Sequence, residues 1–383
     1  MYSRFGLVLM VTHDCNMRCS YCYAGARAQR HMPQHIARKA IDRAIASIEP
    51  GGTLELGFFG GEPLLEAGLV LAMADYARYC AAGRSRAATR GMGLSLNLTT
   101  NGTVTDPLAW AAMTLPGMDL AVSHDGLPEV HNKHRRRPDG CATSCRGLRT
   151  IHRLLDEGRP FRVVMVVRPD NVESLPAGVG FLHGLGVPRV EPVLDLWARW
   201  TPADAPKLEA AVAECARIWR NAMPSFGISW FEEKFARLTG ERLDGTARCG
   251  FGAGEVAVAP SGNLYPCERL IGADADGDPM RLPGHVLDGA DFLSLPDPPC
   301  RVAEPCAGCS VASLCNTSCR CSNYVRTGDA CRPDGLLCTL NHACLRETVK
   351  VLEEMGGHGA QGGPWPNVQS GESPAAQEAA GHL

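Results

Sequence analysis

The first two-thirds of the chain alternates short apolar runs with longer segments whose apolar residues recur at helical spacing. The apolar runs are nearly uninterrupted, as expected for strands that are buried on both faces. Suitable helix-starting residues, Pro33 and Asp106, precede two of the helical segments. The predicted strands are residues 7–12, 54–59, 94–99, 119–123, 162–167 and 189–193. The predicted helices are residues 33–48, 65–82, 106–113, 145–157 and 174–185.

Strands that alternate with helices in this way predict parallel strands joined by crossover helices. We therefore expect an α/β fold built as a partial, TIM-like (β/α)6 barrel. Such a barrel carries its chemistry at the C-terminal ends of its strands. Polar motifs follow the first five predicted strands in just these places: His13–Cys22, GGEP, TNG, SHDG and Arg168.

The last third of the chain has a different pattern. A helical segment at about 204–223 leads into short strands, turns and cysteines between Cys249 and Cys344. A core this small is marginal without metal or covalent cross-links. The end is rich in Gly, Pro, Gln, Ser and Ala, which is typical of a disordered tail. We expect a barrel at 1–200, a helical linker at 201–248, a cysteine-rich domain at 249–345 and a tail at 356–383.

The chain has 383 residues, of which 18 are cysteines, and this cysteine count is its most unusual total. Neither a secretory segment nor a membrane-spanning apolar stretch is found, so we expect a cytoplasmic protein whose clustered cysteines bind metal. The net charge of −3 gives no reason to expect nucleic acid or a membrane as a partner.

Three cysteines, Cys15, Cys19 and Cys22, lie in the loop after the first predicted strand. Thiolates are the usual ligands of iron–sulfur clusters. Three of them on a [4Fe–4S] cube leave one iron open for a chelating small molecule. The alternative is a zinc site completed by His13 or His31.

The combination of motifs resembles the radical SAM superfamily over residues 5–195. The CxxxCxxC loop is followed by an aromatic residue, and Gly60-Gly61-Glu62-Pro63 resembles the GGEP motif of that family. TTNGT at 99–103 resembles its third-strand motif, and Ser123-x-Asp125-Gly126 with His131 and Arg135 resembles its fourth. The resemblance implies that S-adenosylmethionine (SAM) chelates the open iron and is cleaved to a 5′-deoxyadenosyl radical.

The resemblance also implies a SAM pocket. Gly60, Gly61 and Glu62 would meet the methionyl ammonium, Ser123 would bond the ribose, and Asn101 would lie near the same ligand. Arg135 or a neighbour would pair the carboxylate, and Tyr21 and Tyr23 would pack beside the adenine or the loop. Each residue also has a purely structural interpretation: Gly-Gly and Asn-Gly as turns, and Ser123 as a strand-end cap.

The second cysteine region resembles the SPASM extension of radical SAM enzymes over residues 249–345. That resemblance implies two auxiliary [4Fe–4S] clusters, three clusters in all. The first would be held by Cys249, Cys267 and Cys319, and the second by Cys306, Cys309, Cys315 and Cys338. Zinc is the alternative for Cys306–Cys319.

Several further cysteines depart from the SPASM pattern. Cys321 is the most suggestive fourth ligand for the first auxiliary cluster, and Cys331 competes with Cys338 for the last position. Cys300 and Cys344 are also extra, and Cys141 and Cys145 are interpreted as loop residues rather than active-site thiols.

SPASM enzymes mostly act on peptides or proteins, so the resemblance implies a maturase, with a ribosomally made precursor peptide as the leading substrate. It also implies a reductant such as flavodoxin or ferredoxin. We expect no leader-binding domain at the N-terminus, which leaves recognition to the barrel or to a separate leader-peptide-binding protein. Glu191 and Asp195 are candidate acid–base groups by placement alone. The alternatives are an anaerobic sulfatase-maturating enzyme, a small-molecule dehydrogenase and a non-catalytic iron–sulfur scaffold.

Overall fold

The structure is a computed structural model that describes residues 1–24, 30–83, 91–240, 250–275, 277–296, 304–312, 314–315 and 319–356. The chain forms two compact units. The first unit comprises Met1–His124, Asn132–Phe161 and Cys249–Pro298. The second unit comprises Asp125–His131, Arg162–Arg248 and Pro299–Leu383.

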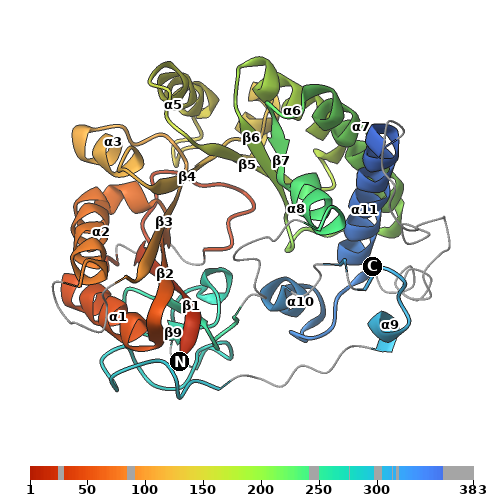
Figure 1. Ribbon diagram of the computed structural model, residues 1–383. Coiled ribbons are helices and arrows are strands. Elements are labelled where there is room, and N and C mark those ends of the chain that lie inside the picture. The colour runs from red at the N-terminus through yellow and green to blue at the C-terminus, as the bar shows by residue number, and fades with distance from the viewer. Residues whose placement is uncertain are drawn as a thin grey trace. The chain divides into compact units, whose positions relative to one another are not determined.

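The first unit is built on a mostly parallel sheet with the strand order β4-β3-β2-β1-β8-β9 (Figure 1). Its first four strands are β1 Tyr2–Thr12, β2 Ile48–Gly60, β3 Gly93–Thr100 and β4 Met118–Ser123. These strands confirm the first four predicted strands, and β1 and β2 are longer than predicted. All three pairings among them are parallel.

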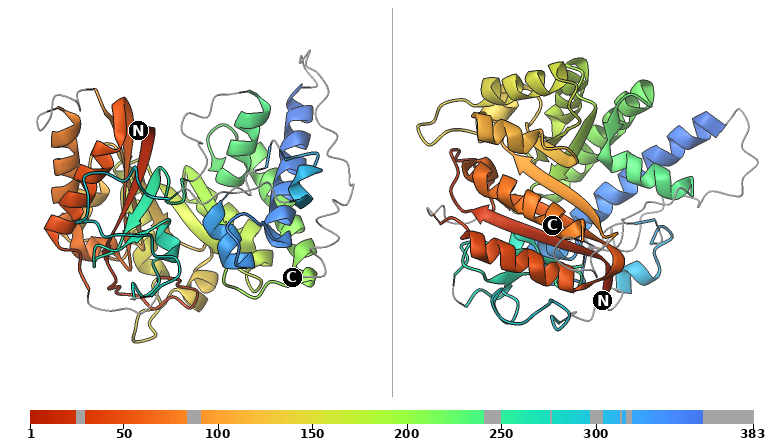
Figure 2. Two further views of the ribbon diagram at one scale, coloured as in Figure 1. Left: turned by 90° about the horizontal axis from the view of Figure 1, so that it is seen from below. Right: turned by 60° about the vertical axis from the view of Figure 1, so that its left-hand side comes forward.

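Helices α1 Gln34–Ala46, α2 Ala67–Ala81, α3 Pro107–Met113 and α5 Ser144–Asp156 lie beside these strands (Figures 1 and 2). A short turn of 3-10 helix, Pro63–Glu66, precedes α2. Asp106 caps α3, because its Oδ1 accepts hydrogen bonds from the backbone N–H groups of Leu108 and Ala109. A further helix, α4 Pro128–His134, was not predicted.

The start of the cysteine-rich region extends this sheet. Strand β8 Glu255–Val258 pairs in parallel with β1, placing Val256 opposite Leu7, and β9 Leu264–Tyr265 returns antiparallel to β8. The pairing covers an edge of β1 that would otherwise expose unpaired backbone groups. The predicted short strands therefore exist, but β8 belongs to the main sheet, which the local sequence pattern did not reveal.

The second unit contains the parallel strands β5 Arg162–Val167, β6 Arg189–Leu194 and β7 Gly227–Ile228. β5 and β6 confirm the last two predicted strands. Helix α6 Leu175–Gly184 and helix α7 Ala205–Ala222 match predicted helical segments. Helices α8 Ser229–Leu238, α9 Glu304–Ala307, α10 Arg320–Thr327 and α11 Gly335–Gly356 were not predicted.

Helix α11 packs against α7 and α8, and the three helices lie side by side in both views (Figures 1 and 2). Aromatic residues join α7 to α8: the rings of Trp219 and Phe231 are stacked with their centroids 5.3 Å apart. The sequence predicts short strands and turns up to Cys344, whereas the structure has a helix from Gly335 onward.

The two compact units are divided differently from the predicted segments, because Cys249–Pro298 is assigned to the first unit and Pro299–Leu383 to the second. The boundaries 1–200, 201–248, 249–345 and 356–383 stay a prediction about sequence segments. The tail at 357–383 lies outside the described residues.

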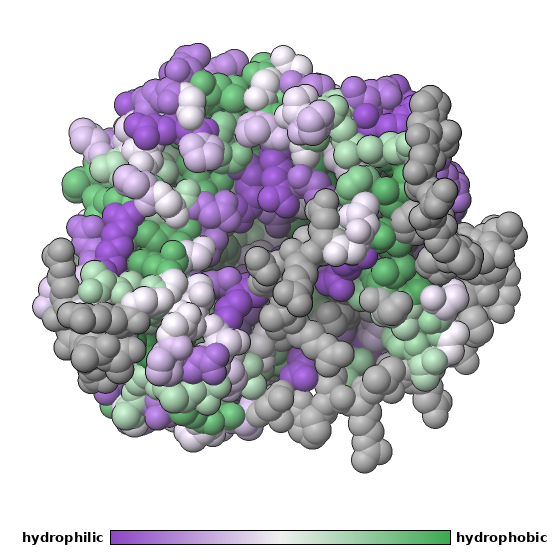
Figure 3. Space-filling view, viewed as in Figure 1, coloured by the Kyte–Doolittle hydropathy of each residue, from purple (hydrophilic) through white to green (hydrophobic). Residues whose placement is uncertain are grey.

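Hydrophilic and hydrophobic side chains are interspersed over the face that Figure 3 shows. Among the described residues, no helix combines the length and the apolar composition that a membrane span needs.

Candidate active site

The predicted cluster cysteines lie in the loop that leaves β1. Cys15 is buried, Cys19 is half-buried and Cys22 is exposed, and none of the three is in a disulfide. The loop is shaped by its own polar groups. The N–H of Cys15 donates to Asp14 Oδ1 at 2.8 Å, and Arg18 Nη1 donates to the Cys15 carbonyl at 2.7 Å. The N–H of Met17 points at Cys15 Sγ from 3.4 Å, so a backbone donor already faces this sulfur.

The GGE motif packs directly against the start of the cysteine loop. The N–H of Gly61 donates to the Thr12 carbonyl and the N–H of Glu62 donates to the Asp14 carbonyl, both at 2.9 Å. A Cβ on Gly60 would lie 2.4 Å from the Thr12 carbonyl oxygen, and one on Gly61 would lie 2.1 Å from the Asp14 carbonyl oxygen. The two glycines are therefore required for the contact between the end of β2 and the cysteine loop.

Glu62 is buried, with 1% of its surface exposed, and it joins the ends of β2 and β3. Its Oε1 accepts hydrogen bonds from Leu64 N at 3.0 Å and Thr100 Oγ1 at 2.7 Å, and its Oε2 accepts from Asn101 N at 2.7 Å. Burial raises the pKa of Glu62 to about 7, although these hydrogen bonds oppose the shift. The carboxyl group is thus poised to change charge near neutral pH.

Asn101 reaches back from β3 to the cysteine loop. Its Nδ2 donates to Asn16 Oδ1 at 2.8 Å and lies 4.0 Å from Cys15 Sγ. Asn16 Nδ2 in turn donates to Thr103 Oγ1 at 2.9 Å, and the N–H of Thr103 donates to Asn101 Oδ1 at 2.9 Å. The TNG motif therefore fixes the cysteine loop, and it places an amide donor near the first predicted cluster ligand.

The segment after α4 lies along the other side of the cysteine loop. The N–H of Ser20 donates to the His134 carbonyl at 3.0 Å, and Ser20 Oγ lies 2.7 Å from His134 Nδ1. The guanidinium of buried Arg135 stands over the ring of Tyr21, 5.2 Å from its centroid. The predicted residues Tyr21 and Arg135 are thus brought together. His134 was missed, because the only hint of it in the sequence is its place beside Arg135.

The fourth-strand motif divides into two parts. Ser123 ends β4 in the first unit and is half-buried. In the second unit, Asp125 Oδ1 accepts a hydrogen bond from Val166 N in β5 at 3.0 Å. Gly126 has a φ of +79°, and a Cβ there would lie 2.5 Å from the Cα of Gly178 in α6. Asp125 and Gly126 therefore have clear structural roles.

A buried acidic residue, Asp274, links the first cysteine-rich segment to the catalytic side of the first unit. Asp274 Oδ1 accepts hydrogen bonds from Asn263 Nδ2 at 2.9 Å and Tyr265 OH at 3.2 Å, and Oδ2 accepts from Arg30 Nη1 at 3.0 Å. His13 Nε2, two residues before Cys15, lies 3.9 Å from the same Oδ2. Burial alone would raise the pKa of Asp274, but His13, Asn263 and Arg30 hold it well below its usual range.

We expect Asp274→Ala to lower the free energy of unfolding by about 3 kcal/mol, because it leaves buried donors and a cation without their carboxylate. Since the folded pKa of Asp274 lies below its unfolded value, this contribution is present above about pH 4 and lost as the pH falls further. Urea unfolding of the metal-loaded chain at neutral and acidic pH measures both effects.

Asp288→Ala is the matched control, since Asp288 is an exposed carboxylate in the same segment. It should change stability by no more than about 0.5 kcal/mol. Equal losses in the two variants would show that Asp274 has no special role.

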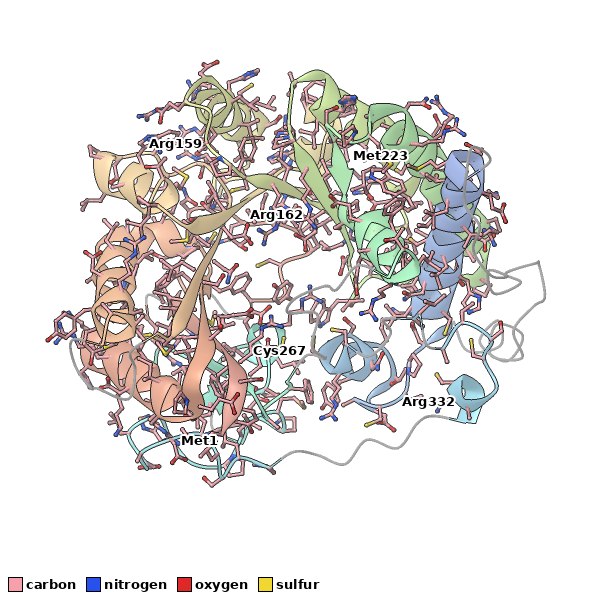
Figure 4. The ribbon with its side chains drawn as sticks, viewed as in Figure 1. Met1, Arg159, Arg162, Met223, Cys267 and Arg332 are labelled. Carbon is pink, nitrogen blue, oxygen red and sulfur yellow. The ribbon has the colours of Figure 1, made fainter. Side chains whose placement is uncertain are left out.

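Cys267 follows β9 by two residues and is labelled in Figure 4. Charged groups near Cys22 and near Cys267 both act on the hydroxyl of Tyr23. Burial raises its pKa far above the usual range, and among the charges acting on it are those of Arg269, Glu268, Cys267 and Cys22. The ring of Tyr23 also stacks on Phe59 with a centroid distance of 6.2 Å. Cys267, a predicted ligand of the first auxiliary cluster, and Cys22 of the cysteine loop therefore both act on the same tyrosine.

The four predicted ligands of the second auxiliary cluster interact with one another in the second unit. Burial raises the pKa of Cys338 to about 12, and Cys315, Cys306 and Cys309 add to the shift. Cys315 and Cys309 act on Cys306 in the same way. Cys331 is disulfide-bonded, whereas Cys338 is a free thiol, which favours Cys338 for the last position.

The predicted ligands of the first auxiliary cluster are less fully described. Cys249 and the extra Cys300 lie outside the described residues, Cys267 belongs to the first unit and Cys319 to the second. Cys321 Sγ lies 3.4 Å from Cys319 Sγ, which keeps Cys321 as the leading prediction for a fourth ligand.

Two other groups of predicted residues, a pair of cysteines and a pair of carboxylates, can be judged from their exposure and contacts. Cys141 and Cys145 are exposed free thiols. Cys141 lies in a loop as interpreted, but the interpretation is wrong for Cys145, which is the second residue of α5. Glu191 pairs with Arg162 at 2.7 Å, and Asp195 pairs with Arg168 while its Oδ1 accepts from the N–H of Trp197 at 3.0 Å. These ion pairs favour structural roles over acid–base roles for the two carboxylates.

The donor set fits iron–sulfur clusters by its chemistry, since thiols dominate both cysteine regions and thiolates are the usual ligands. Within the part of the chain that the structure describes, no three His, Cys, Asp or Glu side chains are gathered tightly enough to hold one metal ion. A cube places its ligands on separate irons and so holds them farther apart than a single zinc ion does.

The first unit combines parallel strands, a three-cysteine loop after β1 and a GGE motif packed on that loop. This combination is typical of radical SAM domains. The radical SAM superfamily matches residues 9–177. Residues 9–177, which are less than half of the chain, therefore correspond to a radical SAM domain.

Relatives in sequence carry several names. A serine-type anaerobic sulfatase-maturating enzyme of Klebsiella aerogenes is 26% identical, over 80% of this chain and 76% of that protein. A PqqA peptide cyclase of Methylobacterium sp. is 23% identical, over 86% of this chain and 84% of that protein. An uncharacterized protein of Methanocaldococcus jannaschii, MJ0907, is 28% identical, but the match spans 47% of this chain and 59% of that protein.

Solved structures share the fold. Native anSMEcpe with bound AdoMet and the Kp18Cys peptide has a TM-score of 0.71 at 18% identity, covering 92% of this chain and 98% of that one. SuiB of Streptococcus suis bound to its precursor peptide SuiA has a TM-score of 0.58 at 14% identity, covering 85% of this chain and 74% of that one. The predicted partial barrel with a cysteine-rich extension is thereby confirmed as the fold.

Proposed function

We propose that this enzyme is a maturase that cleaves SAM reductively and abstracts a hydrogen atom from a peptide or protein. Its leading substrate is a ribosomally made precursor peptide, in which the reaction forms a cross-link or an oxidised side chain. The observation that carries the proposal is the contact of the GGE and TNG motifs with the cysteine loop, since all three elements converge on Cys15. Relatives named for peptide cyclisation and sulfatase maturation support the substrate class.

Cys15, Cys19 and Cys22 would hold the catalytic [4Fe–4S] cluster. When bound, the cluster and SAM supply an electron and a carbon-centred radical. The residues of the chain bind and orient. Glu62 and the backbone of Gly60 and Gly61 would meet the methionyl ammonium. Asn101 fixes the loop, and Arg135 supplies a buried cation beside Tyr21 for the SAM carboxylate.

The two auxiliary clusters of the proposal are held by the second cysteine region. Cys249, Cys267 and Cys319 would hold the first, with Cys321 as a possible added ligand, and Cys306, Cys309, Cys315 and Cys338 would hold the second. A reductant such as flavodoxin or ferredoxin would supply the electron for SAM cleavage, and a separate leader-binding protein is a candidate partner.

The substrate class is tested by mass spectrometry after anaerobic incubation with SAM and dithionite. The candidate substrates are short peptides encoded beside the gene. A peptide that loses hydrogens in step with 5′-deoxyadenosine formation supports the maturase. Deoxyadenosine that rises only with a small molecule, and never with a peptide, overturns it in favour of the dehydrogenase.

An anaerobic sulfatase-maturating activity is the second candidate, because relatives with that name cover most of this chain. It predicts conversion of a cysteine or serine in a sulfatase-derived peptide to formylglycine. Aldehyde-specific labelling of the product separates this reaction from cross-linking, since a carbon–carbon or thioether bond gives no aldehyde.

Glu62→Gln should weaken SAM binding and remove part of its pH dependence. The pKa of Glu62 is raised by burial to about 7, and only the ionised carboxylate attracts the methionyl ammonium. Raising the pH from about 6 to about 8 should therefore tighten SAM binding by wild type about tenfold more than by the variant. Equilibrium binding of SAM to the reduced, iron-loaded proteins measures this difference.

Glu66→Gln is the control, because Glu66 is a partly exposed neighbour that pairs with His31 at 2.6 Å. It should leave both the affinity and the pH dependence unchanged. If Glu62→Gln instead lowers the iron content at all pH values with no change in SAM affinity, Glu62 serves only to join the loops.

A further inference from the structure

The two ends of the cysteine loop meet in the first unit, and we call residues 11–13 and 30–32 the neck of this loop. The N–H of His13 donates to the Arg30 carbonyl at 3.0 Å, and the N–H of Met32 donates to the Val11 carbonyl at 2.8 Å. Thr12 Oγ1 lies 3.3 Å from the Arg30 carbonyl and donates to it as well. The proposed ligands of the catalytic cluster lie between the two ends, so opening of the neck would free both ends of the loop that carries them.

Asp274 reaches the neck from residues 255–275, the segment that also carries Cys267. Its side chain is fully buried. Oδ2 accepts a hydrogen bond from Arg30 Nη1 at 3.0 Å, and the backbone carbonyl of Asp274 accepts from the same nitrogen at 3.2 Å. Neither ring nitrogen of buried His13 makes a hydrogen bond among the described residues, and its Nε2 lies 3.9 Å from Oδ2. One carboxylate oxygen therefore interacts with both sides of the neck.

The other carboxylate oxygen of Asp274 is held by its own segment. Oδ1 accepts hydrogen bonds from Asn263 Nδ2 at 2.9 Å and from Tyr265 OH at 3.2 Å, and both donors are buried. These bonds fix the direction of the carboxylate, because a buried donor that loses its acceptor costs free energy. Asp274 therefore joins the segment 255–275 to the neck through a carboxylate whose orientation is set in advance.

An apolar contact joins the same segment to the loop beyond its last cysteine. Ala24, two residues after Cys22, is buried in a hydrophobic cluster whose other members are Met10, Ala257, Ala259, Tyr265 and Ile271. All of these except Met10 belong to the segment 255–275. Apolar burial is non-directional, so it favours the contact without fixing the neck. The polar contacts of Asp274 provide that direction.

The backbone of Asp274 is a second, independent sign that its side chain has a role. Its φ is +53°, in the left-handed region that is uncommon for residues other than glycine. Glycine adopts this conformation at no steric cost, whereas another residue persists there only when its surroundings hold it. The contacts of the carboxylate with the neck are the interactions that a glycine at this position would lack.

We propose that Asp274 is a positioning residue that holds the neck of the cysteine loop closed and thereby retains the catalytic [4Fe–4S] cluster. The inference rests on the proposed function, because it requires a cluster at Cys15, Cys19 and Cys22. A cluster is released when its ligands separate, and a closed neck limits how far the two ends of the loop can move apart. Asp274 acts through Arg30 and the loop, and it is not a catalytic residue.

The test is the rate at which the iron-loaded full chain loses its catalytic cluster to excess EDTA under anaerobic, native conditions. Electron paramagnetic resonance of dithionite-reduced samples follows the cluster, whose signal is the one absent when Cys15, Cys19 and Cys22 are all replaced by Ala. Asp274→Asn keeps the size of the side chain and tolerates the left-handed backbone, but it removes the charge. In this variant the catalytic signal should be lost about tenfold faster than in wild type, because the charge-assisted bond from Arg30 is weakened.

Hydrogen–deuterium exchange of the same iron-loaded proteins separates an effect on the neck from a general loss of stability. Peptides that cover residues 8–14 should exchange faster in Asp274→Asn than in wild type, since the N–H of His13 is protected by its bond across the neck. Peptides that cover α7 in the second unit should exchange at the wild-type rate. A general loss of stability would increase the exchange of both sets of peptides.

Two further variants make the test specific. Arg30→Met removes the cation from the other side of the contact, and it should also speed the loss of the catalytic signal. Because 45% of the Arg30 side chain is exposed, this variant replaces Asp274→Asn if the latter fails to load iron. In the double variant the two effects should not multiply, since both residues act through one contact. Asp288→Asn removes an exposed carboxylate of the first unit and should lose the signal at the wild-type rate.

The outcomes separate this inference from the proposed function. If the triple cysteine variant lacks no signal that wild type has, there is no cluster at these cysteines, and the proposed function and this inference fall together. A catalytic cluster that is present, but is lost at the wild-type rate in both Asp274→Asn and Arg30→Met, overturns this inference alone. Exchange that rises equally in the neck and in α7 would also overturn it, because Asp274 would then support only the fold.

Discussion

The triple variant Cys15→Ala, Cys19→Ala and Cys22→Ala is expected to lose all formation of 5′-deoxyadenosine while keeping most of its iron. These thiols lie in the loop that leaves β1, and they are the proposed ligands of the cluster that binds and reduces SAM. Iron should fall from about twelve to about eight atoms per chain, because one of three four-iron cubes is removed. Iron analysis and a dithionite-driven deoxyadenosine assay on the anaerobically loaded protein measure both quantities.

The matched control is the double variant Cys141→Ala and Cys145→Ala, which removes two exposed free thiols of the same unit. It should retain wild-type iron and activity. Residual deoxyadenosine formation in the triple variant would move the catalytic cluster to another set of cysteines. Loss of activity in the control would instead give Cys141 or Cys145 a part in the reaction.

Gly61→Ala is expected to have the second-largest effect. The new Cβ would stand 2.1 Å from the carbonyl oxygen of Asp14, which is backbone and cannot move without shifting the cysteine loop. Overpacking of this kind costs about 3 kcal/mol. Because the displaced atoms adjoin Cys15, iron loading of the catalytic cluster should fall together with stability. Urea unfolding and iron content of the variant measure these losses.

Gly68→Ala provides the comparison, since Gly68 lies in α2 and a Cβ there meets no atom within 4 Å. Alanine favours a helix over glycine by about 1 kcal/mol, so this variant should be as stable as wild type or slightly more so. If Gly61→Ala behaves like Gly68→Ala, the contact between the GGE motif and the cysteine loop does not control the site.

Much of the fold was predictable because the strands of the barrel carry an uninterrupted apolar pattern. The runs that became β1 to β6 needed no tertiary information to be recognised. Strand β8 is different: it is a four-residue run that could have paired with any edge, and its place beside β1 depends on a contact between distant parts of the chain. Helix α11 was not predicted, because the cysteines in this segment have the spacing of metal ligands as well as positions on a helix.

In the candidate site, too, local patterns could be predicted from the sequence and contacts between distant residues could not. The cysteine loop and the GGE and TNG motifs were visible in the sequence because each is a local pattern. Their mutual contacts were not visible, and the structure assigns Gly61 and Asn101 a role in shaping the loop. Asp274 has no local motif at all. Its importance comes from burial and from partners far away in the chain, which only a three-dimensional arrangement reveals.

We propose that the chain uses SAM and three iron–sulfur clusters for radical chemistry. Anaerobic reconstitution followed by iron and sulfide analysis and a dithionite-driven assay for 5′-deoxyadenosine tests this most directly. We expect about twelve irons per chain, with matching sulfide, and deoxyadenosine that depends on dithionite. Bound zinc in place of iron, with no deoxyadenosine, would contradict the proposal.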